Sequence, residues 1–250
     1  AAVMAVSKSG TTAETSSLLE VLWDRLRVTH GDSTGARFVA LTEPGTPLVE
    51  LADERRFRAV LSHPVDVGGR FSPHTAVGAF PSVWLGHDTR QLLASGARAL
   101  AAISLNHPAI ELAALLASVS PQPWARLAWC ASPGLEPLGM WAEQLVAEST
   151  GKDGKGILPV IVTRVPEPSG AWPHTLWLSP RFTDEETGAL DAGLDALATA
   201  GHPVLRWRLR RDALGEAFAV LELATAVTGL LLGVNPFDEP DVGRAKERAR

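Results

Sequence analysis

Five hydroxyl groups, a lysine and a glycine lie within residues 7–15, SKSGTTAET, directly after the apolar run AVMAV. A strand that leads through such a segment into a helix places backbone amides, hydroxyl donors and a helix N-terminus together, an arrangement that binds phosphate. Lys8 adds a full positive charge, and Gly10 permits a sharp turn or a close approach to a ligand. The alternative is that the Ser and Thr side chains only cap the helix. The spacing is not that of a nucleotide P-loop, which disfavours ATP and GTP.

Three further segments carry side chains suited to anion binding or acid–base chemistry. Gly69 and Arg70 follow a predicted strand, so the backbone and a forked guanidinium donor can approach a ligand there. Glu148 stands at the end of a predicted helix, just before Gly151, and Lys246 lies close to the C-terminus. Taken singly, each of these charged residues has an ordinary alternative as a side chain on a solvated surface.

These groups must be positioned by the strands and helices of the fold. Along the chain, short apolar runs typical of strands alternate with segments whose apolar residues recur at the spacing of a helix. Strands are predicted at residues 2–6, 37–43, 57–63, 125–132, 157–165, 175–179 and 202–209. Helices are predicted at about 11–29, 136–150, 183–201 and 215–234, and a helical pattern over 73–118 connects the two halves. This alternation predicts an α/β fold with parallel sheets covered by helices.

Composition narrows the functional classes. A chain of 250 residues with 46% hydrophobic content can bury the core of one or two domains. The net charge of −5 gives no general attraction to nucleic acid or anionic membranes. The single cysteine, Cys130, excludes an internal disulfide framework and a cysteine zinc cluster. Because neither a leader pattern nor an unbroken apolar stretch of about 18 residues is present, we expect a cytoplasmic protein that does not span a membrane.

Several segments of the chain, taken in their order along the sequence, resemble glucose-6-phosphate isomerase, and most closely the bacterial form that is fused to transaldolase. The matching segments are SKSGTTAET, VGGRFSPHTAVG, EQLVAESTGKDGKGILPV, GHPVLRWRL and LLGVNPFDEPDVGRAK, which together span nearly the whole chain. The resemblance implies two sugar-isomerase-type α/β domains, each a three-layer αβα arrangement with a parallel sheet. We place an incomplete first domain and its helical connection at residues 1–119, and a second domain with C-terminal helices at 120–250.

The resemblance also implies a role for each matching residue. The phosphate of a hexose 6-phosphate is expected at Ser7, Lys8, Ser9 and Thr12. Glu148 is expected to move a proton between C2 and C1 through a cis-enediol, with Arg70 beside the reacting carbons and Lys246 near the ring oxygen. Substrate contacts are expected from Gly69, Gln144 and Glu239. The reaction needs no metal or other cofactor, and the implied partner is a second copy of the chain in a homodimer, with no nucleic acid and no membrane.

Three features depart from the family pattern. The glycine- and serine-rich segment that precedes the phosphate loop in the family is not found in this sequence. There is no HQGT motif, which carries the ring-opening histidine in animal-type enzymes; His202 and His174 are candidate substitutes, with a structural role as the alternative. Glu239 stands where many relatives have glutamine.

Two other functions therefore stay open beside the isomerase. One is a non-catalytic phosphosugar-binding or regulatory module, which would need the phosphate loop but not Glu148, Arg70 and Lys246. The other is an inactive fragment of a larger isomerase. Use of mannose 6-phosphate as a substrate also stays open.

Overall fold

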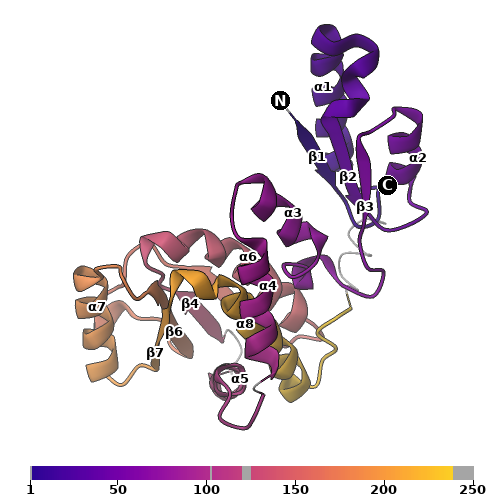
Figure 1. Ribbon diagram of the computed structural model, residues 1–250. Helices are drawn as coiled ribbons and strands as arrows, with labels where there is room; N and C mark the ends of the chain where they lie inside the picture. The colour runs from indigo at the N-terminus through magenta and orange to yellow at the C-terminus, as the bar shows by residue number, and fades with distance from the viewer. Residues whose placement is uncertain (1, 102, 120–124, 239–250) are drawn as a thin grey trace. The chain divides into compact units, whose positions relative to one another are not determined.

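The computed structural model describes residues 2–101, 103–119 and 125–238 of the chain (Figure 1). The chain forms two compact units, residues 1–89 and 90–250, and each unit contains one parallel sheet. The α/β fold with parallel sheets that the sequence predicts is therefore confirmed. The division between the units lies at Thr89, which differs from the boundary at 119/120 that the sequence analysis predicts.

The first unit alternates strands and helices around a three-stranded sheet of order β1-β2-β3. Its elements are β1 (Val3–Val6), α1 (Ala13–His30), η1 (Gly31–Arg37), β2 (Phe38–Thr42), α2 (Pro47–Glu54), β3 (Ala59–Ser62), η2 (Gly69–Phe71) and α3 (Ala76–Trp84). Because each strand is followed by the neighbouring parallel strand, both connecting helices pack on the same face of the sheet. That face carries Phe38 and Ala40, which form one buried cluster with Leu19 of α1 and Leu48 of α2.

The second unit has a four-stranded parallel sheet of order β5-β4-β6-β7. Its elements are α4 (Thr89–Ala101), α5 (Pro108–Val119), β4 (Arg126–Trp129), η3 (Pro133–Leu135), α6 (Glu136–Thr150), β5 (Leu158–Ile161), η4 (Pro168–Gly170), β6 (Thr175–Phe182), α7 (Gly188–Thr199), β7 (Val204–Leu209), η5 (Arg211–Ala213) and α8 (Leu214–Leu232). Every residue of β6 is buried, as expected for the inner strand of a sheet covered on both faces.

Helices cover the two faces of this second sheet. Leu194 and Leu197 of α7 pack against Trp177 on one face. On the opposite face, Gly139 of α6 lies so close to Trp129 that a Cβ at position 139 would come within 2.7 Å of the indole ring. Helix α8 packs in turn against α5 and α6.

The packing of α8 explains why the units divide before α4. A Cβ at Gly215 would lie 1.8 Å from the carbonyl oxygen of Leu92, so the backbones of α8 and α4 are in direct contact. Helix α5 packs against α8, and Leu112 and Leu116 are among the buried residues of α5. Residues 90–119 are therefore packed as part of the second unit rather than as a connection.

Helix α8 is strongly apolar. By length and composition alone, the helical stretch of residues 211–232 could cross a membrane. Half of that apolar stretch is buried inside the protein. Its buried residues include Ala217, Val220, Leu221 and Ala224. The helix is accounted for as a core element of the second unit.

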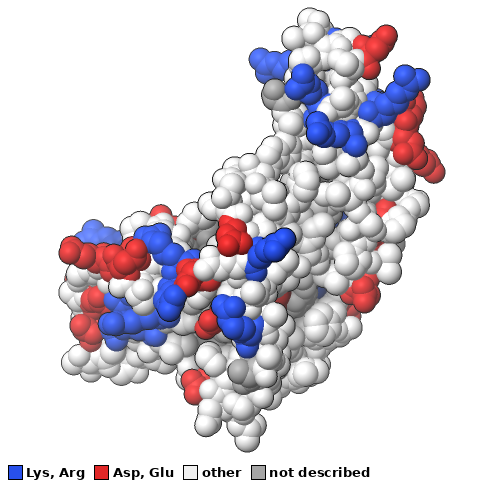
Figure 2. All heavy atoms as spheres, viewed as in Figure 1, with Lys and Arg blue, Asp and Glu red and all other residues white. Residues whose placement is uncertain are grey.

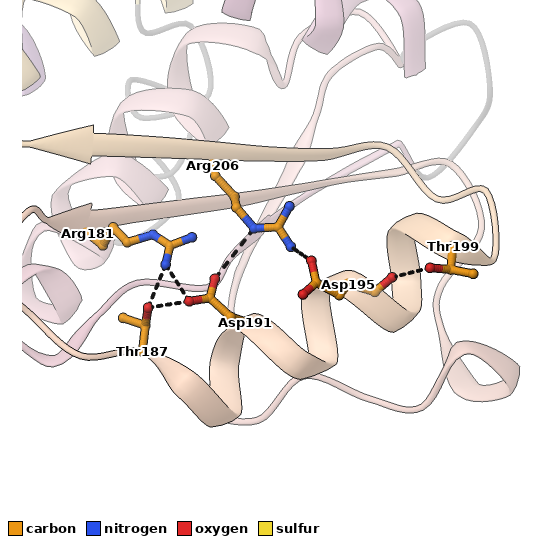
Figure 3. A network of polar contacts seen from close by, with 6 residues as sticks. All are labelled: Arg181, Thr187, Asp191, Asp195, Thr199 and Arg206. Atoms are coloured by element: carbon orange, nitrogen blue, oxygen red, sulfur yellow. Dashed lines mark hydrogen bonds and ion pairs between the residues drawn. The ribbon is translucent and has the colours of Figure 1, made fainter.

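A polar network fixes α7 to the edge of the same sheet (Figure 3). Arg181 of β6 donates from Nη1 to Asp191 Oδ2 at 2.6 Å and to Thr187 Oγ1 at 2.5 Å. Arg206 of β7 lies 3.5 Å from the other oxygen of Asp191 and also pairs with Asp195. On the face seen in Figure 2, basic and acidic side chains are interspersed over the second unit.

Candidate functional site

The segment between β1 and α1 is a compact loop anchored to the end of β2. The Ser7 amide donates to the Leu41 carbonyl at 3.1 Å, and the Lys8 carbonyl accepts from the Glu43 amide at 3.2 Å. The hydroxyl of Thr42 donates to the same Lys8 carbonyl at 3.2 Å. These bonds hold the loop at the carboxyl edge of the sheet, where parallel α/β folds bind ligands.

The hydroxyl groups of this loop pair with one another just before α1. Ser7 Oγ lies 2.8 Å from Thr12 Oγ1, and Ser9 Oγ lies 2.9 Å from Thr11 Oγ1. Thr12 occupies the N-cap position, yet its side chain forms no capping hydrogen bond. The Thr11 amide donates to Ser9 Oγ at 3.4 Å and the Thr12 amide donates to Ser7 Oγ at 3.5 Å. The same hydroxyls therefore serve both alternatives, contact with the amides that precede α1 and binding of an anion.

Lys8 and Gly10 give this loop its charge and its shape. Lys8 is exposed, and its Nζ lies 3.5 Å from Glu43 Oε1. Gly10 has φ of +65°, and a Cβ there would lie 2.8 Å from the Cβ of Thr46. Gly10 is thus required both by backbone conformation and by close packing against the start of α2. Glu43 is a member of the site that the sequence analysis missed, because nothing in its local sequence marks its contact with Lys8.

Arg70 lies in the segment that follows β3, which begins at the carboxyl edge of the first unit's sheet. The His63 amide donates to the Thr42 carbonyl at 2.8 Å, which ties the end of β3 to the end of β2. Arg70 itself is only 1% exposed, and its guanidinium carbon lies 5.5 Å from the centroid of the Phe71 ring. A side chain so enclosed holds its positive charge in a fixed place, as electrostatic stabilisation of a reaction requires.

At position 69, unlike position 10, nothing among the described residues requires a glycine. The φ of Gly69 is not in the left-handed region, and a Cβ there would meet nothing within 4 Å. Gly69 is exposed beside the buried Arg70. The missing side chain therefore leaves open space at position 69.

Glu148 and Gln144 lie one turn apart on α6, in the second unit. Gln144 Nε2 donates to Glu148 Oε1 at 3.2 Å. Glu148 is half-buried and Gln144 is exposed, so the carboxylate is held at the surface near the end of the helix. The helix ends at Thr150, whose hydroxyl accepts from the Ile157 amide at 3.0 Å.

Lys152 connects this helix end to the C-terminal segment and is a second residue that the sequence analysis missed. Its side chain is buried and donates to the carbonyl groups of Asn235 and Asp238, the latter at 2.9 Å. Its Nζ also lies 2.6 Å from the Asp238 carboxylate. The segment that leads toward Glu239 is therefore bound by Lys152, which follows Glu148 by four residues in the sequence. Lys152 stands in the matching segment EQLVAESTGKDGKGILPV, but no role was assigned to it there.

His202 and His174 lie at the amino ends of β7 and β6, respectively. Both line a cavity of about 370 Å³ whose other lining residues are Ser118, Val119, Thr175, Gly201 and Pro203. His174 has φ of +51°, in the left-handed region. Neither Glu148 nor Gln144 lines this cavity, so the structure does not bring the histidines to the candidate base within it. Two further predicted residues, Glu239 and Lys246, lie outside the described residues.

The described residues, 2–101, 103–119 and 125–238, include no group of three or more His, Cys, Asp or Glu side chains that could hold a metal ion. Among the same residues, Cys130 is a buried thiol whose pKa is raised to about 12 by burial, which makes it unreactive. The candidate groups of the first unit are thus hydroxyls, backbone amides and the basic residues Lys8 and Arg70, and those of the second unit are Glu148 and Gln144.

Comparison with known proteins gives one consistent set of relatives. The chain is 32% identical to a glucose-6-phosphate isomerase from Rubrobacter xylanophilus over 98% of its own length, and it spans 66% of the length of that relative. A hypothetical protein from Thermus thermophilus has a TM-score of 0.87 and 27% identity, with 100% of this chain and 70% of that one covered. A glucose-6-phosphate isomerase from Chlamydia trachomatis has a TM-score of 0.76 and 23% identity, with coverage of 99% and 58%. No family model matches the chain.

Proposed function

The chain belongs to the glucose-6-phosphate isomerase family, and from this premise we propose that it interconverts glucose 6-phosphate and fructose 6-phosphate. The observation that carries the proposal is the loop of residues 7–12. Its hydroxyls lie at the carboxyl edge of a parallel sheet, next to the N-terminus of α1, where within the described residues the Thr12 side chain forms no capping hydrogen bond. In this proposal the substrate phosphate receives hydrogen bonds from Ser7, Ser9 and Thr12 and the charge of Lys8.

Phosphate binding far from the reacting carbons serves the chemistry by fixing the substrate. Binding energy from the phosphate orients C1 and C2 beside the catalytic groups and makes the proton transfer effectively intramolecular. In this proposal the phosphate loop and Arg70 of the first unit bind and stabilise the substrate, and Glu148 of the second unit transfers the proton.

Glu148 is the proposed general base. Its carboxylate takes the proton from C2 of the open-chain aldose, which gives a cis-enediol, and returns that proton to C1 to give the ketose. The hydrogen bond from Gln144 orients the carboxylate. Arg70 stabilises the negative charge that develops on the O1 and O2 oxygens, and the open space at Gly69 admits the substrate.

Ring opening is assigned to Lys246, with Glu239 as a contact of the sugar hydroxyls. Support for this assignment comes from Lys152, which holds the preceding segment, up to Asp238, against the end of the helix that carries Glu148. His202 stays a second candidate for the ring-opening proton transfer. We further propose a homodimer in the cytoplasm, with no cofactor.

A non-catalytic phosphosugar-binding module is the alternative function. Such a module would use the phosphate loop and would have no need for a carboxylate oriented by Gln144 or for a buried arginine beside an exposed glycine. These features of the described residues favour the isomerase.

A turnover assay with a matched pair of variants separates the two functions. Glu148→Gln removes the base, and we expect kcat to fall by at least about 10²-fold, because a general acid–base step contributes about that much or more. Affinity for fructose 6-phosphate, measured by calorimetry, is expected to stay within a few fold of the wild type. Glu143→Gln changes an exposed carboxylate on the same helix and is expected to leave both quantities unchanged. Absence of turnover in the wild type as well as in both variants, with fructose 6-phosphate still bound, would leave the phosphosugar-binding module as the function. Wild-type turnover in Glu148→Gln would remove Glu148 from its role as the base.

A further inference from the structure

A cavity of about 390 Å³ lies at the amino edge of the first unit's sheet. Three of its lining residues show its position directly, because Ala2 precedes β1, Arg37 precedes β2 and Arg58 precedes β3. The phosphate loop of residues 7–12 follows β1 and lies at the carboxyl edge. The cavity is therefore separate from the proposed phosphate site within the same unit.

The walls of this cavity are apolar and aromatic. Val39 of β2 lies on the side of the sheet opposite to Phe38, and Phe80, Val83 and Trp84 come from α3. The Phe80 and Trp84 rings are packed edge to face with centroids 5.5 Å apart. Trp84 is 45% exposed and Val83 is 63% exposed.

Helix α3 as a whole shows that this apolar surface is uncovered in the described structure. Ser82 is the only polar side chain in its sequence AVGAFPSVW, yet none of its nine residues is buried. A helix of this composition normally packs against a partner on at least one face. Apolar surface that stays exposed next to a cavity is typical of a ligand-binding or interaction site.

Two guanidinium groups complete the lining. Arg37 and Arg58 are both exposed, and within the described part of the chain neither forms a salt bridge or a side-chain hydrogen bond. Arg55, in contrast, is paired with Glu20 and lies over the Trp23 ring. Arginine presents a planar, forked donor that matches a carboxylate or phosphate, so two unpaired arginines beside one apolar cavity favour an anionic ligand.

We propose that this cavity binds a small organic anion with a flat apolar body, such as an aromatic carboxylate or an aromatic phosphate. The apolar body lies between Val39 and the Phe80–Trp84 pair, and the anionic group is bound by Arg37 and Arg58. The cavity volume falls in the range of about 300–1,000 Å³ that is usual for small-molecule sites, which are mostly apolar with a few placed polar groups.

The test uses the whole chain and the fluorescent dye anilinonaphthalene sulfonate, an aromatic anion. We expect saturable binding that is weakened about tenfold or more in the double variant Arg37→Ala, Arg58→Ala, the change that corresponds to losing about 1.4 kcal/mol. Trp84→Ala is expected to weaken binding similarly. The double variant Arg25→Ala, Arg27→Ala removes the same charge from exposed positions on α1 and is expected to leave binding unchanged.

Four results would overturn the proposal. The first is equal weakening in the two double variants, and the second is equal affinity for the uncharged analogue that lacks the sulfonate. The third is displacement of the dye by fructose 6-phosphate, which would place it at the phosphate loop. The fourth is dye binding that declines as the chain self-associates in sedimentation velocity, which would make a second copy of the chain the occupant.

Discussion

Gly10 is the residue on which the shape of the phosphate loop depends most directly. Its positive φ suits glycine, and the Thr46 side chain and the Leu48 amide lie 2.8 and 3.0 Å from where a Cβ would stand. The neighbouring hydroxyls of Ser7 and Thr12 are 2.8 Å apart only because the chain turns at this point. A change at Gly10 should therefore be felt both in stability and in phosphate binding.

We predict that Gly10→Ala lowers the free energy of unfolding by roughly 2–4 kcal/mol, the sum of left-handed backbone strain and overpacking. Affinity for fructose 6-phosphate should fall at least about tenfold, because the loop must move. Urea unfolding and calorimetry measure the two effects. Gly45→Ala is the matched control, since Gly45 has φ of +74° but a Cβ there meets nothing within 4 Å. It should cost only about 1 kcal/mol and leave binding intact; a loss of affinity as large as that of Gly10→Ala would contradict the prediction.

The candidate groups of the proposed site can be picked out from local sequence, whereas the contacts that support them cannot. Ser7, Lys8 and Arg70 stand in short runs whose composition indicates anion binding. The contact of Lys8 with Glu43 joins residues 35 positions apart, and that of Lys152 with Asp238 joins residues 86 positions apart. Periodicity and composition describe neighbours in sequence, so such long-range pairs are found only once the strands and helices are placed.

At the scale of elements, the attachment of α7 to the second sheet rests on one carboxylate between two arginines (Figure 3). The hydrogen bond from Arg181 is the main cause that lowers the pKa of Asp191 to about 2, with help from the Thr187 hydroxyl and the charges of Arg181 and Arg206. Burial opposes this shift. The ionised form of Asp191 is therefore favoured in the folded protein.

We predict that Asp191→Asn lowers the free energy of unfolding at neutral pH by about 1 kcal/mol, a value reduced for solvent screening because a third of the side chain is exposed. Since the folded pKa is depressed, this stabilisation is fully present above the unfolded value of 3.8 and is lost as the pH falls toward 2. Urea unfolding of wild type and variant should thus differ at pH 7 and converge at pH 2. A difference independent of pH would contradict the prediction.

The Asp195→Asn variant is the control for this network. Asp195 also pairs with Arg206, but its side chain is 70% exposed, and exposed ion pairs contribute little to stability. We expect its effect on the free energy of unfolding to be smaller than that of Asp191→Asn at neutral pH.

The alternation of strands and helices was predictable because it depends on local patterns. The prediction of a strand at residues 202–209 corresponds to β7, Val204–Leu209, and that of a helix at 136–150 corresponds to α6. The place of α4 and α5 was not predictable in this way, because their partner α8 lies about a hundred residues further along the chain. The sequence pattern of an apolar helix predicts that the helix packs against another element, but it does not identify that element.

At the scale of the whole molecule, the two units should behave as separate folding entities. We predict that a fragment of residues 90–250 unfolds cooperatively on heating, whereas a fragment of residues 120–250 does not. The shorter fragment lacks α5, which packs against α8, and with it the buried side chains of Leu112 and Leu116, each of which contributes roughly 1.5–3 kcal/mol by burial. Circular dichroism of the two fragments provides the measurement, and equal melting temperatures would restore the boundary at 119/120.

The central claim is that Glu148 moves a proton between adjacent carbons of a hexose 6-phosphate. NMR of fructose 6-phosphate incubated with the chain in heavy water tests it most directly, because deuterium entering C1 reports proton abstraction even when net turnover is slow. We predict incorporation by the wild type and by Glu143→Gln, together with formation of glucose 6-phosphate, and none by Glu148→Gln. Incorporation by Glu148→Gln at the wild-type rate, or its absence from a wild type that binds the sugar phosphate, would contradict the account.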